Sequence, residues 1–588
     1  MGISHLYTTL RPLATWAALE DEAVVIDGPA LAYHSLHICR AGGIRQPSYA
    51  LLNRVTISWL ESLCRHNVLI RKLYFDGFLP RAKLQVRMGR MMRATTRLNR
   101  LYVSHLQGCP VSCLAADDIE ADVDIYKSGG ADVCPLTDPC FLVPAVLNCL
   151  RESTQYRKIT EVVPGEADHF CAANVSKYGG VLITSDSDLL VHNLGEGQVA
   201  FFRDLHAESG HCFKFLSFAP RQIFDKVGLA YPEKAIQLAY ERKMVPQATL
   251  SRLIDICSKP APLSADYIEF VENYTTSEEV VRLQKVGLEV PNLNDLDPRV
   301  SELVLEFYSR RSGMSMNSSI RMFLPPLTEC PGLRSAWDKS TPIRQLAYSI
   351  GSHILPRNDG CLQVREFRRV ESISHAGRQV RLLPTNLMRE YLDDILSCAE
   401  CCEADIQRDG IKFWVFLAMA LDKLESIRKG EETLTETIDK YFVGLTAKSG
   451  DTSVAWGIVH IAAQMQGTLY SLRVLQQTLR SVFSPEIDEA LPEVTGLYTM
   501  LSELIPVELY PCTTDLLRIA RELQKSRSLY ALDAFLTKKF CGNESPDNEG
   551  EEIESTLTDD SESALSAKSG TNTNDDENNP FSVLSLEG

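Results

Sequence analysis

Short buried strands that each run into an acidic residue are the feature that most constrains the fold of this chain. Three β-branched and apolar runs share this pattern. They are 23–27 with Asp27, 72–76 with Asp76, and 180–184 with Asp186 and Asp188. Because helical patterns separate these runs, the alternation predicts an α/β domain with a parallel sheet. Ligand sites in open sheets of this kind lie outside the carboxyl ends of the strands, so the acids are expected at one edge.

A further pair of carboxylates follows another predicted strand at 159–163. Pro164 and Gly165 open a helical stretch there, which places Glu166 and Asp168 in its first turn. One aspartate after a strand is commonly a turn or N-cap residue, and Asp27 alone allows that interpretation. Several strands that share the feature favour a common site instead. Carboxylates held close together repel one another, so a bound Mg²⁺ or Mn²⁺ is expected.

The segment 81–100 is strongly basic and contains no acidic residue. Its charged side chains are Arg81, Lys83, Arg87, Arg90, Arg93, Arg97 and Arg100. Of these, Lys83, Arg87, Arg90 and Arg97 are predicted to share one helical face that tracks nucleic-acid phosphates. The alternative is a solvated basic face, or a docking surface for the acidic C-terminal residues. The neighbouring acids favour nucleic acid.

The net charge of −17 over 588 residues is unevenly distributed. Residues 541–588 hold 13 acidic residues and one lysine, a net of −12, so the first 540 residues carry only −5. This segment is rich in polar residues and is predicted to be a disordered acidic tail. Between 216 and 540 the apolar residues recur at spacings of three and four, as in 303–307 and 413–424, which predicts an irregular helical domain. The α/β domain is expected over 1–215.

The location of the protein is predicted from the absence of certain signals. The first ten residues are mixed and polar rather than signal-like, and the longest apolar stretch, 413–421, is shorter than the about 20 residues of a membrane span. The 17 cysteines show no regular framework, so reduced thiols are expected. A nuclear or cytoplasmic protein is predicted, neither secreted nor bound to a membrane.

Taken as a set, these motifs resemble those of the XPG/flap-endonuclease superfamily of PIN-like nucleases, and within it the asteroid-type proteins. The likeness covers about the first 205 residues. The similar segments are the Met-Gly-Ile start, 24–28 with Asp27, 73–77 with Asp76, 164–168 with Glu166 and Asp168, and 184–188 with Asp186 and Asp188. Lys83 and Arg90 follow Asp76 by 7 and 14 residues, like the family's phosphate-contacting lysine and arginine.

The resemblance implies a divalent-metal-dependent, structure-specific nuclease that cuts DNA by a two-metal mechanism in DNA repair or processing. It implies two Mg²⁺ or Mn²⁺ ions held by the acids, which are Asp27, Asp76, Glu166, Asp168, Asp186 and Asp188. Lys83 and Arg90 are the implied catalytic cations on the scissile phosphate, and Arg87, Arg93 and Arg97 are expected to contact further phosphates. The expected partner is nucleic acid, with DNA favoured over RNA.

One departure from the family pattern supports a competing hypothesis. The family has a seventh acid in a Gly-x-Asp-Tyr-like segment and then a glycine-rich helix-hairpin-helix. The stretch 235–243 has neither the glycines nor an aspartate, and Glu241 is only a weak substitute. A nuclease-fold scaffold that binds protein or RNA partners through its helical region or tail is therefore the alternative. A phosphatase of small phosphoesters is a third, against which the basic segment argues.

Overall fold

The computed structural model describes most of the chain up to residue 541. The described residues are 3–80, 83–114, 120–127, 137–208, 212–272, 274, 292–311, 319–355, 363–408, 410–433, 436, 453–483, 491–526 and 528–541. Met1–Leu536 form one compact unit, and a second unit begins at Thr537. The predicted acidic tail lies outside the described residues beyond Cys541. None of the described helices is both long and apolar enough to span a bilayer.

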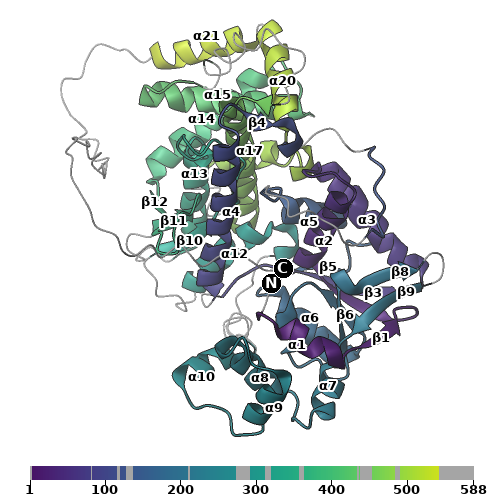
Figure 1. Cartoon of the computed structure of the whole chain (residues 1–588). Helices are drawn as coiled ribbons and strands as arrows, with labels where there is room; N and C mark the ends of the chain where they lie inside the picture. Colours follow the sequence, from purple (N-terminus) through teal and green to yellow (C-terminus); the bar gives the residue numbers. More distant parts are fainter. Residues whose placement is uncertain are drawn as a thin grey trace, which may run out of the picture. The chain divides into compact units, whose positions relative to one another are not determined.

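The predicted parallel sheet is confirmed, with five strands in the order β5-β3-β2-β6-β7. The strands are β2 (Ala23–Asp27), β3 (Leu69–Asp76), β5 (Thr160–Val163), β6 (Val181–Thr184) and β7 (Gln198–Phe201). All neighbouring pairs are parallel, so the carboxyl ends of the five strands lie at one edge (Figure 1). The order places β2, with its terminal aspartate, at the centre between β3 and β6.

Two hydrophobic layers cover the sheet because alternate strand residues point to opposite faces. In β2, Val24 and Ile26 pack with α2 (Gly28–Ala41), α3 (Tyr49–Arg65) and α5 (Leu142–Glu152). Val25 points the other way, into a separate cluster with α6 (Ala167–Tyr178).

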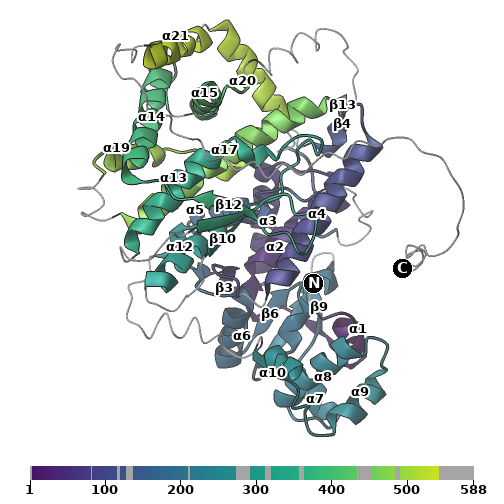
Figure 2. The same ribbon diagram turned by 90° about the vertical axis from the view of Figure 1, so that its left-hand side faces the viewer.

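The second layer continues into a small group of helices after the sheet. They are α7 (Pro220–Lys226), α8 (Glu233–Met244), α9 (Leu250–Cys257) and α10 (Ala265–Glu272). Their buried residues belong to the same cluster as Val25, and α1 (Leu6–Leu10) lies beside them (Figure 2). These helices are called the α7–α10 lobe below. A short antiparallel sheet in the order β1-β9-β8 adjoins β7 through an isolated bridge between Val199 and Phe218. Its strands are β1 (Thr15–Ala18), β8 (Leu205–Glu208) and β9 (Cys212–Ser217).

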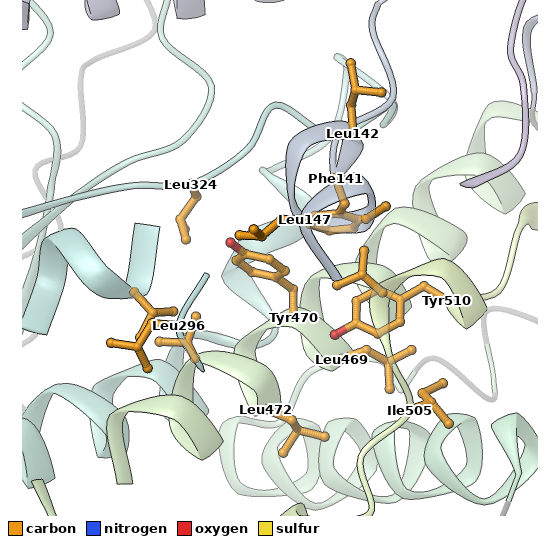
Figure 3. Packing of buried hydrophobic residues seen from close by; sticks show 14 of the residues in the cluster. Phe141, Leu142, Leu147, Leu296, Leu324, Leu469, Tyr470, Leu472, Ile505 and Tyr510 are labelled. Carbon is orange, nitrogen blue, oxygen red and sulfur yellow. The ribbon is translucent and has the colours of Figure 1, made fainter. Parts of the chain in front are cut away.

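The first layer extends without a break into the helical region. That region contains α12 (Pro298–Arg311), α13 (Thr341–Gly351), α14 (Thr385–Glu403), α15 (Ile411–Lys429), α17 (Trp456–Val482), α19 (Glu493–Leu501), α20 (Thr513–Lys525) and α21 (Ser528–Cys541). Phe141, just before α5, stacks on Tyr470 of α17 at 4.8 Å and meets Tyr510 edge-on at 5.6 Å (Figure 3). The helical region thus shares one core with the sheet domain.

The helical region also contains a three-stranded sheet, which the prediction of a helical domain missed. Its strands are β10 (Ser319–Phe323), β11 (Gln363–Phe367) and β12 (Arg378–Arg381). Each strand is short and carries charged residues, so its sequence has no clear strand signal. The basic helix α4 (Leu84–Ser104) packs against this sheet, with Met88 and Met91 on Phe323 and Phe367 (Figure 1).

A buried ion pair fixes this sheet to the helices. Arg344 of α13 and Glu366 of β11 are both 0% exposed, and they form a two-point pair at 2.7 and 2.9 Å. The Tyr348 hydroxyl donates to the same carboxylate at 2.7 Å. Each charge is buried, so each depends on the other for its stability.

Glu366→Gln should lower the free energy of unfolding by about 3–5 kcal/mol, because it leaves buried guanidinium groups without a counter-charge. Urea denaturation of the full chain measures this. Arg221→Met is the control, since the Arg221–Glu196 pair is exposed and its loss should stay within about 0.5 kcal/mol. Equal effects of the two variants would contradict a structural role for the buried pair.

Candidate metal and nucleic-acid site

Six acidic residues lie at or just beyond the carboxyl edge of the central sheet, where the sequence predicts them. Asp27 and Asp76 end β2 and β3, and Asp186 and Asp188 follow β6. Glu166 is the N-cap of α6, and Asp168 lies in its first turn. These six residues are called the acid cluster below. The negative charges of other members raise the pKa values of Asp27, Asp76, Glu166, Asp168 and Asp188, so these carboxylates interact electrostatically.

Hydrogen bonds to neighbouring elements orient two members of the acid cluster. Asp27 accepts the Ala30 amide at 3.2 Å and the Thr184 hydroxyl at 2.7 Å. It is therefore both the N-cap of α2 and a member of the acid cluster, so both interpretations of this residue hold. Asp76 accepts the Ala167 amide at 2.7 Å, which ties the end of β3 to the start of α6.

The second aspartate pair is held by its own turn and by the N-terminal segment. Asp186 caps a short 3-10 helix, where it accepts the Asp188 amide at 3.0 Å. Asp188 accepts the Ile3 amide at 2.7 Å. Thr184 accepts the Asp186 amide at 3.0 Å, so its hydroxyl joins Asp27 to this turn. The resemblance already placed the Met-Gly-Ile start near the site, and the Ile3 amide is its contact there. Sequence reasoning gave Thr184 no role, because Asp27 lies more than 150 residues away.

Burial and mutual repulsion both raise the pKa values in the acid cluster. Burial, followed by neighbouring charges, raises the pKa of Asp27 to about 7 and the pKa values of Asp76 and Asp188 to about 6. Asp168 has a pKa well above its usual 3.8, because of burial and the charges of Asp186 and other cluster members. Without a cation, these carboxylates therefore keep their protons to a higher pH than exposed carboxylates do.

Lys83 is the counter-charge of the acid cluster in this structure. Its ammonium nitrogen lies 3.3 Å from Glu166 Oε1. Burial lowers the pKa of Lys83, but the charges of Glu166 and three aspartates of the cluster raise it overall. Arg90 also acts on the site, since its charge, with that of Lys83, lowers the pKa of Asp76. The structure thus brings both predicted catalytic cations to the acids.

The donor set of the acid cluster fits a hard divalent cation. It offers carboxylate oxygens, and their repulsion is the kind that a cation relieves. Among the described residues, no three His, Cys, Asp or Glu side chains already converge as a metal-binding group. The fit therefore rests on the kind of donors and on their shared charge, and the identity and number of the ions stay predictions.

The basic face of α4 differs from the predicted one. Arg87 is half-buried, pairs with Glu302 of α12 at 2.7 Å and lies 3.8 Å over the Phe323 ring. Burial lowers its pKa. The exposed face carries instead Arg90, Arg93, Arg97 and Arg100, called the arginine stripe below. Arg97 lies 3.8 Å from Asp138, and Arg81 lies outside the described residues. The phosphate contact expected of Arg87 stays a prediction. Its guanidinium group is already paired with Glu302 in this structure.

The stretch considered for the seventh acid, 235–243, lies within α8. Glu241 acts from there on Cys257 and Tyr267, whose pKa values are raised by burial and by its charge. It thus faces α9 and α10. Nothing in these contacts supports Glu241 as a substitute for the seventh acid.

A better match to the Gly-x-Asp-Tyr pattern lies just before α8. Residues 228–231 read Gly-Leu-Ala-Tyr, with Ala230 at the position of the aspartate. The Tyr231 hydroxyl donates to the His192 carbonyl and accepts the Leu194 amide, both at 2.7 Å. This segment therefore lies against the loop that follows Asp188, and the spacing of its glycine and tyrosine was the signal that sequence reasoning overlooked.

The metal-free protein should lose stability as the pH rises from about 4 to about 7. The folded-state pKa of Asp27 is raised from 3.8 to about 7, so the folded protein binds more protons than the unfolded chain in this window. The free energy of unfolding then falls with increasing pH. Asp168→Asn should make this decline shallower, since it removes one buried charge. Urea denaturation in EDTA at several pH values measures both slopes.

Asp225→Asn is the control for that experiment, because Asp225 is exposed on α7 and its loss should leave the slope unchanged. A stability that rises over the same window, or an Asp168→Asn slope equal to that of the wild type, would contradict the shared burial of these carboxylates.

Comparisons with known proteins agree with this fold. Residues 138–382 match a family model described as XPG domain containing. This region includes Glu166, Asp168, Asp186 and Asp188, together with the α7–α10 lobe. A curated relative, Asteroid homolog 1 of Schizosaccharomyces pombe, is 22% identical over 358 residues. That match covers 57% of this chain and 56% of the relative, so the chain spans a little over half of the relative's length.

Proposed function

Because part of this chain matches an XPG domain model and the chain resembles an asteroid homolog, we propose that it hydrolyses phosphodiester bonds in DNA with two bound divalent cations. The observation that carries the proposal is that six acidic residues lie at one edge of the sheet, with Lys83 paired to Glu166 and within the field of three of the aspartates. Such repulsion destabilises a protein unless the charges serve a ligand. A role in DNA repair or processing is part of the same proposal.

The acid cluster would hold Mg²⁺ or Mn²⁺. Glu166, Asp168, Asp186 and Asp188 would be the direct or water-mediated ligands, with Asp27 and Asp76 completing the set. Bound there, the two cations would activate a water molecule and offset the charge of the reacting phosphate.

The protein's own groups would position the substrate. Lys83 sits at the acid cluster and would hold the scissile phosphate, with Arg90 beside it. Thr184 and the Ile3 amide fix the orientation of Asp27 and Asp188, so the carboxylates are already aimed when substrate arrives.

The arginine stripe supplies a path for the nucleic-acid backbone away from the reacting phosphate. Arg90 and Arg100 are ten residues apart on α4, a distance of about 15 Å along the helix axis. Side chains at spacings of three and four lie on one face, so the stripe can follow several phosphates of one strand. Small phosphoesters would not need it, which favours a nuclease over a phosphatase.

Incubation of the purified chain with flapped, overhanging and single-stranded DNA, and with RNA, tests the proposal. Cleavage should require Mg²⁺ or Mn²⁺ and stop in EDTA. Asp186→Asn and Lys83→Met should each lower the cleavage rate by at least about 100-fold, because one removes a ligand and the other removes a phosphate contact.

Lys72→Met is the matched control for Lys83→Met. Lys72 lies on β3 of the same sheet and pairs with Glu161 at 2.9 Å on the surface, so its loss should leave the rate unchanged. Cleavage that persists in Asp186→Asn would trace the activity to a contaminant. No cleavage of any of these substrates would contradict the nuclease proposal.

Removal of an arginine from the stripe should lower the affinity for nucleic acid and should also make that affinity less dependent on salt concentration. Arg93→Ala and Arg100→Ala should each reduce the slope of log binding constant against log salt by about 0.7–0.9. Fluorescence anisotropy with a labelled oligonucleotide over a range of KCl concentrations measures this slope. Arg221→Ala is the control, because Arg221 is an exposed arginine on α7, outside the stripe. An unchanged slope in both stripe variants would place the nucleic acid elsewhere.

A catalytically inactive scaffold is the second candidate, and one observation favours it. Ala230 stands where the family pattern has its seventh acid, so the acid cluster lacks that carboxylate. In the scaffold case, nucleic acid or a protein partner would bind without being cut. Tight, salt-dependent RNA binding with no metal-dependent cleavage would support this second function.

A further inference from the structure

A continuous series of aromatic rings connects the acid cluster with the α7–α10 lobe. His169, next to Asp168 in α6, has its ring 5.0 Å from that of His192. The His192 ring lies 5.4 Å from Tyr274, and Tyr274 lies 5.1 Å from Phe270 of α10. Phe270 in turn meets Tyr240 of α8 at 5.4 Å. The edge-on and tilted geometries are those that aromatic pairs favour.

Tyr274 differs from the rings behind it in its exposure. Phe270 and Tyr240 are 6% and 8% exposed, and both belong to the core of the lobe. Tyr274 is only half-buried and packs against that core from outside. A ring that served only to fill the core would be expected to be covered like its neighbours. Tyr274 instead keeps part of its surface uncovered, between the core of the lobe and the two histidine rings that lead to Asp168.

The surroundings of Tyr274 show which way it faces. Its pKa is raised by burial and then by the charges of four members of the acid cluster, with Asp188 and Asp186 the strongest. The phenol is therefore neutral and lies within the field of these carboxylates. His192 behind it is held in place by the Tyr231 hydroxyl on its carbonyl oxygen. Tyr274 thus has a rigid support on the side away from solvent.

We propose that Tyr274 forms an aromatic wall of the site, on which an unpaired nucleobase stacks beside the phosphate held at Lys83. This inference rests on the proposed nuclease function. Tyr274 is a partly exposed residue whose ring packs on His192 and Phe270 and lies within the field of the acids, as a stacking platform requires. A base in a duplex already stacks on both sides, so only an unpaired base has a face to offer. The substrate class is then a nucleic acid whose nucleotide at the site is single-stranded.

This assignment gives the α7–α10 lobe a role that does not depend on a seventh acid. The lobe brings an aromatic side chain, rather than a carboxylate, to the carboxyl edge of the sheet. Stacking on an aromatic ring is tolerant of sequence, because every base has a flat face. The site would therefore select for strand state at this nucleotide and not for a particular base.

Fluorescence of 2-aminopurine in a single-stranded oligonucleotide tests the proposal, since this base loses emission when it stacks. Binding is measured in Mg²⁺ with the Asp186→Asn protein, so that the strand stays intact. Tyr274→Ala should weaken binding about 5- to 100-fold and abolish the quenching. Tyr274→Phe should keep both, because the ring remains. Tyr178→Ala, a 58% exposed tyrosine at the other end of α6, should resemble the parent protein.

Thermal melting of each variant shows whether the lobe remains folded. If Tyr274→Ala, folded like its parent, binds and quenches as well as the parent does, the stacking inference is wrong while the nuclease proposal stands. If Tyr274→Phe loses binding as fully as Tyr274→Ala, the hydroxyl and not the ring is the contact, and stacking is again excluded. If the parent protein binds no single strand of DNA or RNA, the proposed function fails and this inference fails with it.

Discussion

Repulsion among carboxylates at one sheet edge is the constraint on which the rest of the structure depends. Burial raises the pKa of Asp27 and Asp76, and the negative charge of neighbouring carboxylates raises it further. Lys83, which is partly exposed, and hydrogen bonds from Thr184, Ala167 and Ile3 offset part of this repulsion. These contacts orient the acids but do not neutralise them. The repulsion that remains is the reason for the proposal that a divalent cation binds here, with an anionic phosphate next to it.

The helical region is part of the support for this edge. Its core is continuous with the layer of helices behind the sheet, and Phe141 and Tyr470 stack at that junction. The helix α4 spans both parts, since Lys83 at its N-cap reaches the acid cluster while Arg87 is fixed by Glu302 of α12. Changes in the helical region can thus alter the position of the cations at the site.

The local sequence was sufficient to predict the strands and the acids. A buried strand and the aspartate that follows it are neighbours in the chain, so periodicity and composition reveal them together, as at Asp27 and Asp76. The basic face of α4 was predicted less well. Its register depends on which arginine meets Glu302, a residue more than 200 positions away. Tyr274 gave no local signal at all, because its role depends on where the lobe packs.

Calorimetric titration of the metal-free protein with Mn²⁺ tests the central claim most directly, when repeated near pH 6 in buffers of different ionisation enthalpy. The account predicts two ions per chain and the release of protons, since carboxylates with raised pKa values must ionise to bind a cation. Asp186→Asn should weaken the binding. No binding at millimolar Mn²⁺, or binding without proton release that is unchanged in Asp186→Asn, would contradict a metal site at these acids.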